Sequence, residues 1–307
     1  MSTRKVLMNP GSGALAMVES PAGAAARAVL LLPPLFEERK ATLPLLAALS
    51  RRLADDGAVV ARCDVAGTGH ADGDFESLTP ALWQGGMLAT AKMLRSMAPG
   101  APLFVVGTRI SCAWAAWLSN EISGVAGVVF IAPVEGPRFL RQLAQRCAVN
   151  QMVTRGKALL APGKIAEAVA AGQTLDLDGY AVPPALYRSI EQLAVSPCAC
   201  QTLLLATQHD GAEGTPRPAS ETVSFNLPAF WNSTGYMDLS AVVEAACGWI
   251  KKATTTTTAT TTTNAQMPKC PNFFPPDRHL LPQRFAQQAA ARRGGRGGCR
   301  GPARVRG

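Results

Sequence analysis

An arginine stands where a catalytic nucleophile is expected in the stretch LFVVGTRISCAWAAW, residues 103–117. An apolar, partly β-branched run ends at Gly107 and an apolar helical pattern follows almost at once, which predicts a strand, a sharp turn and a helix. The pattern G-x-S-x-G at such a turn is a nucleophile elbow, whose middle serine attacks an acyl carbon. Here the five positions from Gly107 to Ser111 read GTRIS, with Arg109 in the middle. This excludes a conventional serine nucleophile at the elbow.

The other two positions of a serine-hydrolase triad are also incompletely filled. In chain order the acid follows a later strand, and the histidine precedes the last helix. Asp210 follows the apolar run 202–207 and is the candidate acid, while its neighbour His209 is either a candidate base or a residue at a strand end. The segment 225–238, FNLPAFWNSTGYMD, holds no histidine, and Trp231 is its candidate substrate-binding residue.

Three further side chains near the predicted site have a functional and a structural interpretation. Ser111 and Cys112 are the nucleophilic residues closest to the elbow, but both fall in the first turn of the following helix. A small residue for close packing and a buried apolar thiol are the simpler interpretations. His70, in the loop that follows residues 58–64, either reaches the rim of a cleft or belongs to a turn.

Arg109 needs an anionic partner if it enters a cleft, because a buried unpaired charge costs several kcal/mol. Glu37 and Glu38 follow the run LLPPLF and can form an internal ion pair. An anionic ligand can instead bind at the helix N-terminus, where backbone donors and a bidentate guanidinium favour negative charge. In a third arrangement Arg109 points into solvent, and the sequence does not choose among the three.

The elements that must position these residues follow an alternating pattern. Short apolar runs at 26–34, 58–64, 103–107, 127–133 and 202–207 alternate with helical patterns at 43–57, 80–97 and 110–120. This predicts an α/β fold, with a mostly parallel sheet and helices on both faces. A hairpin is expected around residues 10–13. The helical segment 135–195 is too long for an ordinary crossover and predicts an inserted helical cap.

The last helix is expected at 238–252, so residues 1–252 are predicted to form one domain. Residues 253–307 are rich in Thr and then in Arg and Gly, a composition that predicts disorder. This tail carries nine of the 30 basic residues and one of the 21 acidic ones, so the formal charge of +9 belongs almost entirely to it. No aromatic residues alternate with its arginines, and no nucleic-acid partner is expected.

Composition also limits the cofactor and the compartment. The eight cysteines include no C-x-x-C pair, which favours reduced thiols and gives no metal-binding pattern. The segment GTGHADG follows the wrong strand for a dinucleotide fingerprint and lacks its third glycine, so no cofactor is expected. No run is long and apolar enough for a membrane span or a signal peptide, and a cytoplasmic protein is expected.

Six segments in this order resemble one family, the exosortase A system-associated hydrolases, type 2. They read LLPPLFEERK, RCDVAGTGHADGDF, GTRIS, APVEGPRFLRQLAQR, LDLDGYAVPPAL and LPAFWNS, within residues 10–250. The resemblance implies an α/β-hydrolase fold in a bacterial protein linked to exosortase and exopolysaccharide genes, and an arginine at the elbow is also a family feature. Lys40 and His70 depart from the family pattern.

Two hypotheses follow for the function. One is a hydrolase that acts on a small-molecule, acyl or ester-type substrate by a route without the usual serine, with Arg109, His209 and Asp210 as catalytic candidates. The other is a catalytically inactive binding protein on the same fold, in which Arg109 anchors an anionic ligand. In both, Glu37, Glu38, Ser111, His70 and Trp231 are the candidate substrate-binding residues.

Overall fold

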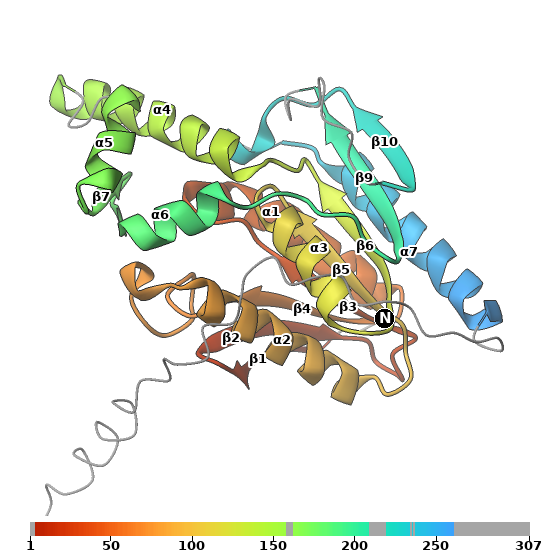
Figure 1. Ribbon diagram of the computed structural model, residues 1–307. Helices are drawn as coiled ribbons and strands as arrows, with labels where there is room; N and C mark the ends of the chain where they lie inside the picture. Colours follow the sequence, from red (N-terminus) through yellow and green to blue (C-terminus); the bar gives the residue numbers. More distant parts are fainter. Residues whose placement is uncertain (1–3, 158–161, 209–218, 234, 236, 261–307) are drawn as a thin grey trace, which may run out of the picture. The chain divides into compact units, whose positions relative to one another are not determined.

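Eight strands form one mixed, mostly parallel sheet in the order β1-β2-β4-β3-β5-β6-β9-β10 (Figure 1). The computed structural model describes residues 4–157, 162–208, 219–233, 235 and 237–260. The hairpin of β1 (Arg4–Gly11) and β2 (Ala14–Ser20) is antiparallel, and β2 pairs antiparallel with β4. The remaining neighbours pair in parallel: β4 (Ala58–Asp64), β3 (Arg27–Leu32), β5 (Leu103–Thr108), β6 (Val125–Ile131), β9 (Gln201–Thr207) and β10 (Glu221–Phe225).

Helices cover both faces of the sheet, which explains why its central strands are continuous apolar runs. In β3, Leu30 belongs to one hydrophobic core, whereas its neighbours Val29 and Leu31 belong to the other. The first core includes α2 (Pro80–Met97) and α3 (Ser111–Glu121). The second includes α1 (Phe36–Asp55) and α7 (Ser240–Thr260).

A helical segment is inserted between β6 and β9, and its elements gather beside the sheet in Figure 1. They are α4 (Gly136–Arg155), η2 (Pro162–Lys164), α5 (Ile165–Ala170), the two-stranded sheet of β7 (Leu175–Leu177) and β8 (Tyr180–Val182), and α6 (Pro184–Glu191). The Gly136 N–H donates to Leu193 O at 2.8 Å, and a Cβ on Gly136 would lie 1.9 Å from Ile190 O. The two ends of this segment, called the cap below, are therefore in close contact.

The structure differs from the sequence-based expectation at three elements. Helix α1 begins at Phe36, seven residues before the expected start, and continues through Pro44. Its first turn therefore contains both Glu37 and Glu38, which were expected in a loop. Helix α7 extends past the expected end at Lys252 to Thr260, with Ala253 buried in the core. Strand β10 was not predicted, because its half-exposed sequence ETVSF lacks a continuous apolar run.

Two short 3₁₀ turns, η1 (Phe75–Ser77) and η3 (Phe230–Asn232), complete the elements around the sheet. Within the described ranges, no helix combines the length and apolar composition needed to cross a lipid bilayer. The expectation of disorder covers residues 253–307: residues 253–260 instead continue α7, and residues 261–307 lie outside the described ranges. His209 and Asp210 also lie outside the described residues.

Candidate functional site

The turn after β5, where the sequence predicts a nucleophile elbow, is sharp and strained. Arg109 has φ 55°, in the left-handed region that a non-glycine residue rarely adopts. Gly107 permits the sharp approach of α3 to β5, because a Cβ there would lie 2.7 Å from both Cys112 Cα and Ser111 O. The Arg109 N–H donates to Ile131 O at 2.9 Å, which ties the turn to β6. The strained turn is thus present, with a guanidinium in place of a nucleophilic hydroxyl.

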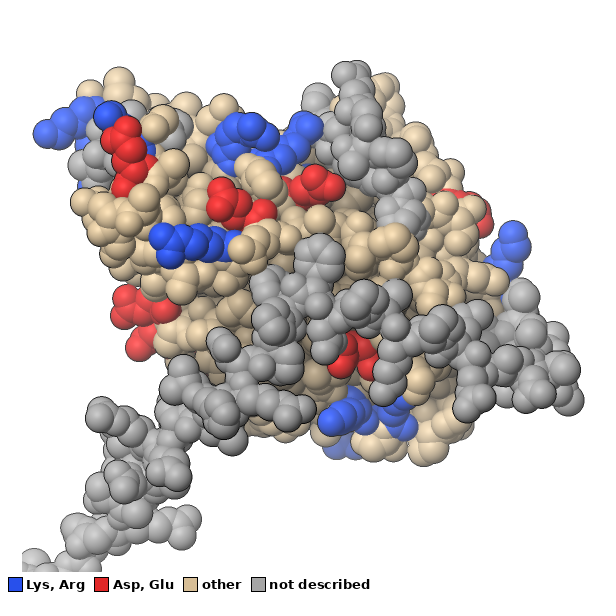
Figure 2. Space-filling view, viewed as in Figure 1, with Lys and Arg blue, Asp and Glu red and all other residues tan. Residues whose placement is uncertain are grey.

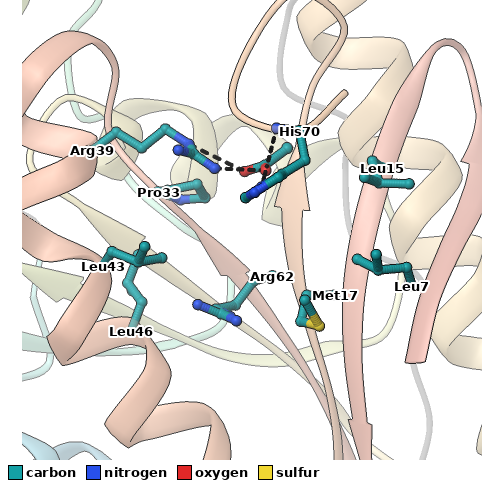
Figure 3. A pocket seen from close by; sticks show the side chains of 10 residues that line it. Leu7, Leu15, Met17, Pro33, Arg39, Leu43, Leu46, Arg62 and His70 are labelled. Atoms are coloured by element: carbon teal, nitrogen blue, oxygen red, sulfur yellow. Dashed lines mark hydrogen bonds and ion pairs between the residues drawn. The ribbon is translucent and has the colours of Figure 1, made fainter. Parts of the chain in front are cut away.

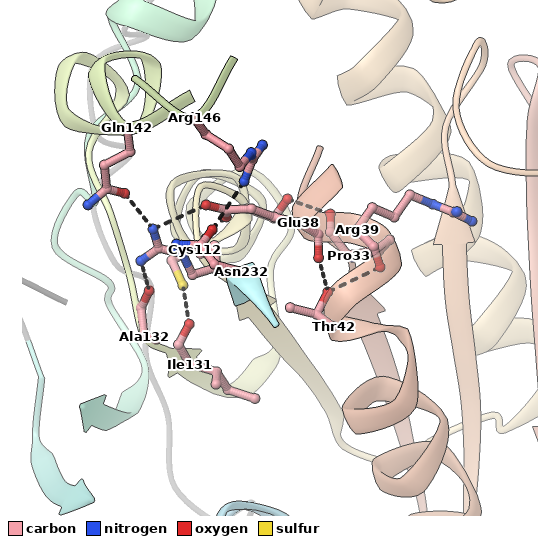
Figure 4. Close-up of polar contacts among 12 residues, drawn as sticks. Pro33, Glu38, Arg39, Thr42, Cys112, Ile131, Ala132, Gln142, Arg146 and Asn232 are labelled. Carbon is pink, nitrogen blue, oxygen red and sulfur yellow. Dashed lines mark hydrogen bonds and ion pairs between the residues drawn. The ribbon is translucent and has the colours of Figure 1, made fainter. Parts of the chain in front are cut away.

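The Arg109 side chain is fully buried. Its donors are directed at protein acceptors, of which Figure 4 labels Glu38, Ala132 and Gln142. Nε and Nη2 donate to the two carboxylate oxygens of Glu38, at 3.1 and 3.3 Å. Nη1 donates to Ala132 O at 3.0 Å, and Nη2 also donates to Gln142 Oε1 at 2.8 Å. The guanidinium carbon lies 3.8 Å from the ring centroid of Trp231, a cation–π contact. Of the three arrangements considered for Arg109, the structure contains the internal ion pair.

Glu38 is the matching anion, and only 2% of its side chain is exposed. Burial raises the pKa of this carboxyl above its ordinary value of 4.5, and the charge and hydrogen bonds of Arg109 act in the opposite direction. Helix α1 orients Glu38 inward from its first turn. The two residues are distant in the sequence and meet only because β3 and β5 are neighbours in the sheet.

Glu37, the adjacent residue, has a different environment. Its half-exposed carboxylate accepts from Lys40 Nζ at 2.8 Å and from the Tyr180 hydroxyl at 3.2 Å. The Tyr180 ring packs edge-on against Phe36 and Phe75, which connects the cap to α1. Burial, followed by the negative charge of Glu37, raises the pKa of the Tyr180 hydroxyl. Glu37 is therefore an accessible carboxylate, whereas Glu38 is enclosed.

A cavity of about 250 Å³ lies beside these aromatic rings. Its lining includes Phe36, Lys40, Thr68, Phe75 and Tyr180. A groove of about 310 Å³ is lined by Glu37 together with cap residues. Both spaces are bounded by α1 and the cap, so a substrate of modest size has room near Glu37 and none at the enclosed guanidinium.

Ser111 and Cys112 have structural roles in this arrangement. Ser111 Oγ donates to Pro33 O at 2.7 Å, so the side chain predicted to bind substrate instead fastens the start of α3 to the end of β3. Cys112 is fully buried, with Sγ 3.2 Å from Gly107 O. Both side chains are inaccessible to a substrate.

His70 and Trp231 differ in their relation to the elbow. The His70 backbone N–H donates to Asp64 Oδ2 at 3.1 Å and its Nδ1 lies 3.5 Å from the same oxygen, while 73% of its side chain is exposed. Its polar contacts are with Asp64 and not with the buried ion pair. Trp231, from η3, is buried against the guanidinium, so it supports Arg109 and has no exposed ring face for a substrate.

Sequence reasoning missed the polar residues that the cap contributes. Gln142 and Arg146, four residues apart on α4, both face this region. Arg146 donates to Asn232 Oδ1 at 3.1 Å, and its Nε lies 3.4 Å from Asp178 Oδ2. The helical spacing of the polar residues in PRFLRQLAQR was the available signal. In the part of the chain that the structure describes, no three His, Cys, Asp or Glu side chains gather as a metal site.

Comparisons with known proteins identify the fold. Neither a protein-family model nor a curated protein matches the sequence. Est1E from Butyrivibrio proteoclasticus, solved with ferulic acid bound, aligns with a TM-score of 0.55 at 16% identity, over 81% of this chain and 98% of that one. DcsB, in complex with its substrate analogue, aligns with a TM-score of 0.53 at 13% identity, over 83% and 100%. The α/β hydrolase GrgF from Penicillium sp. sh18 aligns with a TM-score of 0.53 at 14% identity, over 83% and 100%.

These similarities and the sheet order define the class. The mostly parallel sheet and the helices on both faces are those of the α/β-hydrolase fold. This chain has that fold, and the turn after β5 holds a buried ion pair.

Proposed function

We propose that this chain is an α/β-hydrolase-fold protein of the exosortase-associated type. It binds an acyl or ester-type substrate at the carboxyl edge of its sheet and forms no acyl-enzyme at the elbow. The observation that carries the proposal is the complete burial of Arg109 among Glu38, Ala132 and Gln142. We further propose a cytoplasmic location, and the sequence resemblance supports a role connected with exosortase and exopolysaccharide genes. Two structural neighbours, Est1E solved with ferulic acid and DcsB solved with its substrate analogue, support a small organic substrate.

Loss of the nucleophile has a large expected effect on turnover. Removing the serine from a comparable triad costs on the order of 10⁶ in kcat. Binding and an oxyanion hole alone retain roughly 10³ to 10⁴ over the reaction in water. An anionic ligand would have to displace Glu38 to reach Arg109, so binding at the accessible Glu37 and Tyr180 side is favoured over a guanidinium anchor.

A second candidate is hydrolysis by a water molecule that Glu37 activates. Its support is that Glu37 faces a groove of about 310 Å³ and contacts the Tyr180 hydroxyl. Glu37 would take a proton from water as the water oxygen attacks the acyl carbon, and Tyr180 would donate a proton to the leaving oxygen. His209 and Asp210, which lie outside the described residues, are the alternative catalytic candidates for hydrolysis.

Turnover and probe labelling distinguish the two candidates. The panel contains activated esters and acyl thioesters, tested on the full chain and on the variants Arg109→Ser and Glu37→Gln. The first candidate predicts no turnover above a heat-inactivated control and no fluorophosphonate labelling, even in Arg109→Ser, while an acyl ligand raises the melting temperature. Turnover that Glu37→Gln abolishes supports the second candidate. Strong labelling of Arg109→Ser would reveal a base at the elbow and contradict both.

A further inference from the structure

A separate pocket of about 90 Å³ lies between the β1–β2 hairpin, β4 and α1 (Figure 3). Its walls are hydrocarbon: Leu7, Leu15, Met17, Pro33, Leu43 and Leu46. Its polar residues are Arg39, Arg62, Asp64 and His70. The pocket therefore combines apolar walls with a small charged group, the usual composition of a site for a small amphipathic molecule.

Of the two arginine side chains in the pocket, one has a carboxylate partner and the other has a buried donor without a partner. Arg39 forms a two-point contact with Asp64, with Nε at 3.2 Å and Nη2 at 2.6 Å from the carboxylate oxygens. The side chain of Arg62, on β4, forms no ion pair within the described ranges, and its buried Nε has no hydrogen-bond partner there. Desolvation lowers the pKa of Arg62, and Glu19 and Asp64 oppose this effect. A buried donor without an acceptor is destabilising, so a ligand that offers an acceptor to this nitrogen would be favoured.

The charges of the lining indicate the sign of that acceptor. Arg39 and Arg62 face one carboxylate, Asp64, which leaves one net positive charge when His70 is neutral. The nearby Glu19 is engaged by Lys5, whose Nζ lies 3.1 Å from its carboxylate. A monoanion would balance the lining and give Arg62 the bidentate partner that its planar guanidinium favours.

We propose that this pocket binds a small aliphatic carboxylate, with its head on Arg62 and its chain along the leucine and methionine walls. The pocket volume is several times the roughly 10–15 Å³ that one water molecule requires on the same measure, enough for a short carboxylate. A longer chain continues over Leu7 and Leu43, which are 58% and 38% exposed. The proposal uses neither Arg109 nor Glu37 and is independent of the proposed function.

The test is a calorimetric titration of the full chain with hexanoate. Hexanol and hexylamine serve as the neutral and cationic analogues of the same chain length, and inorganic phosphate as the anion without a chain. Arg62→Met removes the charge but keeps the aliphatic stem, and Arg51→Met removes a nearby exposed arginine outside the lining. Hexanoate should bind saturably, at least about tenfold more weakly in Arg62→Met, and with unchanged affinity in Arg51→Met.

Thermal melting shows whether a loss of hexanoate affinity in Arg62→Met is caused by unfolding of the variant. Without ligand, Arg62→Met should melt at the wild-type temperature or above it, because the variant removes an unpaired buried donor. Four results would overturn the proposal: no saturable binding of hexanoate up to about 10 mM, equal affinity in Arg62→Met, hexylamine or hexanol binding as tightly as hexanoate, or phosphate binding as tightly as hexanoate.

Discussion

Replacing Arg109 by methionine should destabilise the protein strongly, because it leaves the Glu38 carboxylate buried without its countercharge. Removal of one partner of a buried ion pair typically costs about 3–5 kcal/mol. For a domain of about 150–250 residues each kcal/mol lowers the melting temperature by about 2–4 °C, so the expected decrease is about 6–20 °C. The exposed Arg51→Met is the matched control and should change stability by less than about 0.5 kcal/mol.

The pH dependence of this variant gives a second, independent check. The folded-state pKa of Glu38 is raised by burial, and loss of Arg109 removes the interaction that opposes the rise. A carboxyl group whose pKa is higher in the folded state makes its full contribution to stability below the unfolded-state pKa of about 4.3. This contribution is lost as the pH increases through the folded-state pKa. The unfolding free energy of Arg109→Met should therefore be closest to that of the wild type near pH 4.5, and the difference between them should increase toward pH 8.

A double variant shows whether the destabilisation comes from the unpaired charge of Glu38 or from the altered packing at residue 109. Arg109→Met combined with Glu38→Leu leaves no buried charge, and such apolar replacements of buried pairs are often neutral or stabilising. Urea denaturation should show that the double variant is more stable than Arg109→Met alone. Three results would refute the reasoning: Arg109→Met is as stable as the wild type, its loss of unfolding free energy increases as the pH falls, or the double variant is no more stable than Arg109→Met.

Three further predictions concern other parts of the fold. Ser111→Ala should lose about 1 kcal/mol of unfolding free energy with its hydrogen bond to Pro33 O; an unchanged urea midpoint would show that this bond contributes nothing. Burial raises the pKa of the Cys63 thiol to about 12, so iodoacetamide at pH 8 should modify Cys63 only after unfolding, as mass spectrometry would show; rapid labelling of the folded chain would contradict its burial. Deletion of residues 261–307 should leave the melting temperature unchanged, because their Pro, Arg and Gly-rich composition offers little apolar surface to bury; a decrease of more than a few degrees would show that the tail contributes to the fold.

The sheet could be predicted from the sequence because burial on both faces leaves a clear pattern. The runs at β3, β4, β5, β6 and β9 are continuous, apolar and bounded by turn residues. The edge strand β10 has one exposed face, and its ETVSF sequence carries little of this signal. The elbow was also predictable, since Gly107 and the helical pattern after it locate the turn without reference to residue 109.

The partner of Arg109 could not be predicted, because it depends on the register of α1. Successive residues of a helix point about 100° apart, so only one of Glu37 and Glu38 can face the elbow. Which one does so follows from the helix start at Phe36, and the charged sequence before Pro44 conceals that start. The contribution of Gln142 depends in addition on how the cap lies over the sheet, for which a single sequence carries no signal.

The buried pair also limits how the protein can change. Replacing Arg109 alone by serine leaves Glu38 as an unpaired buried carboxylate. Replacing Glu38 first leaves Arg109 as an unpaired buried guanidinium. Either order crosses an intermediate that loses about 3–5 kcal/mol, a large part of the roughly 5–15 kcal/mol by which a typical domain is stable. Positions 38 and 109 must therefore be varied together in a library. In evolution the same coupling would oppose a change of Arg109 to serine for as long as Glu38 is present.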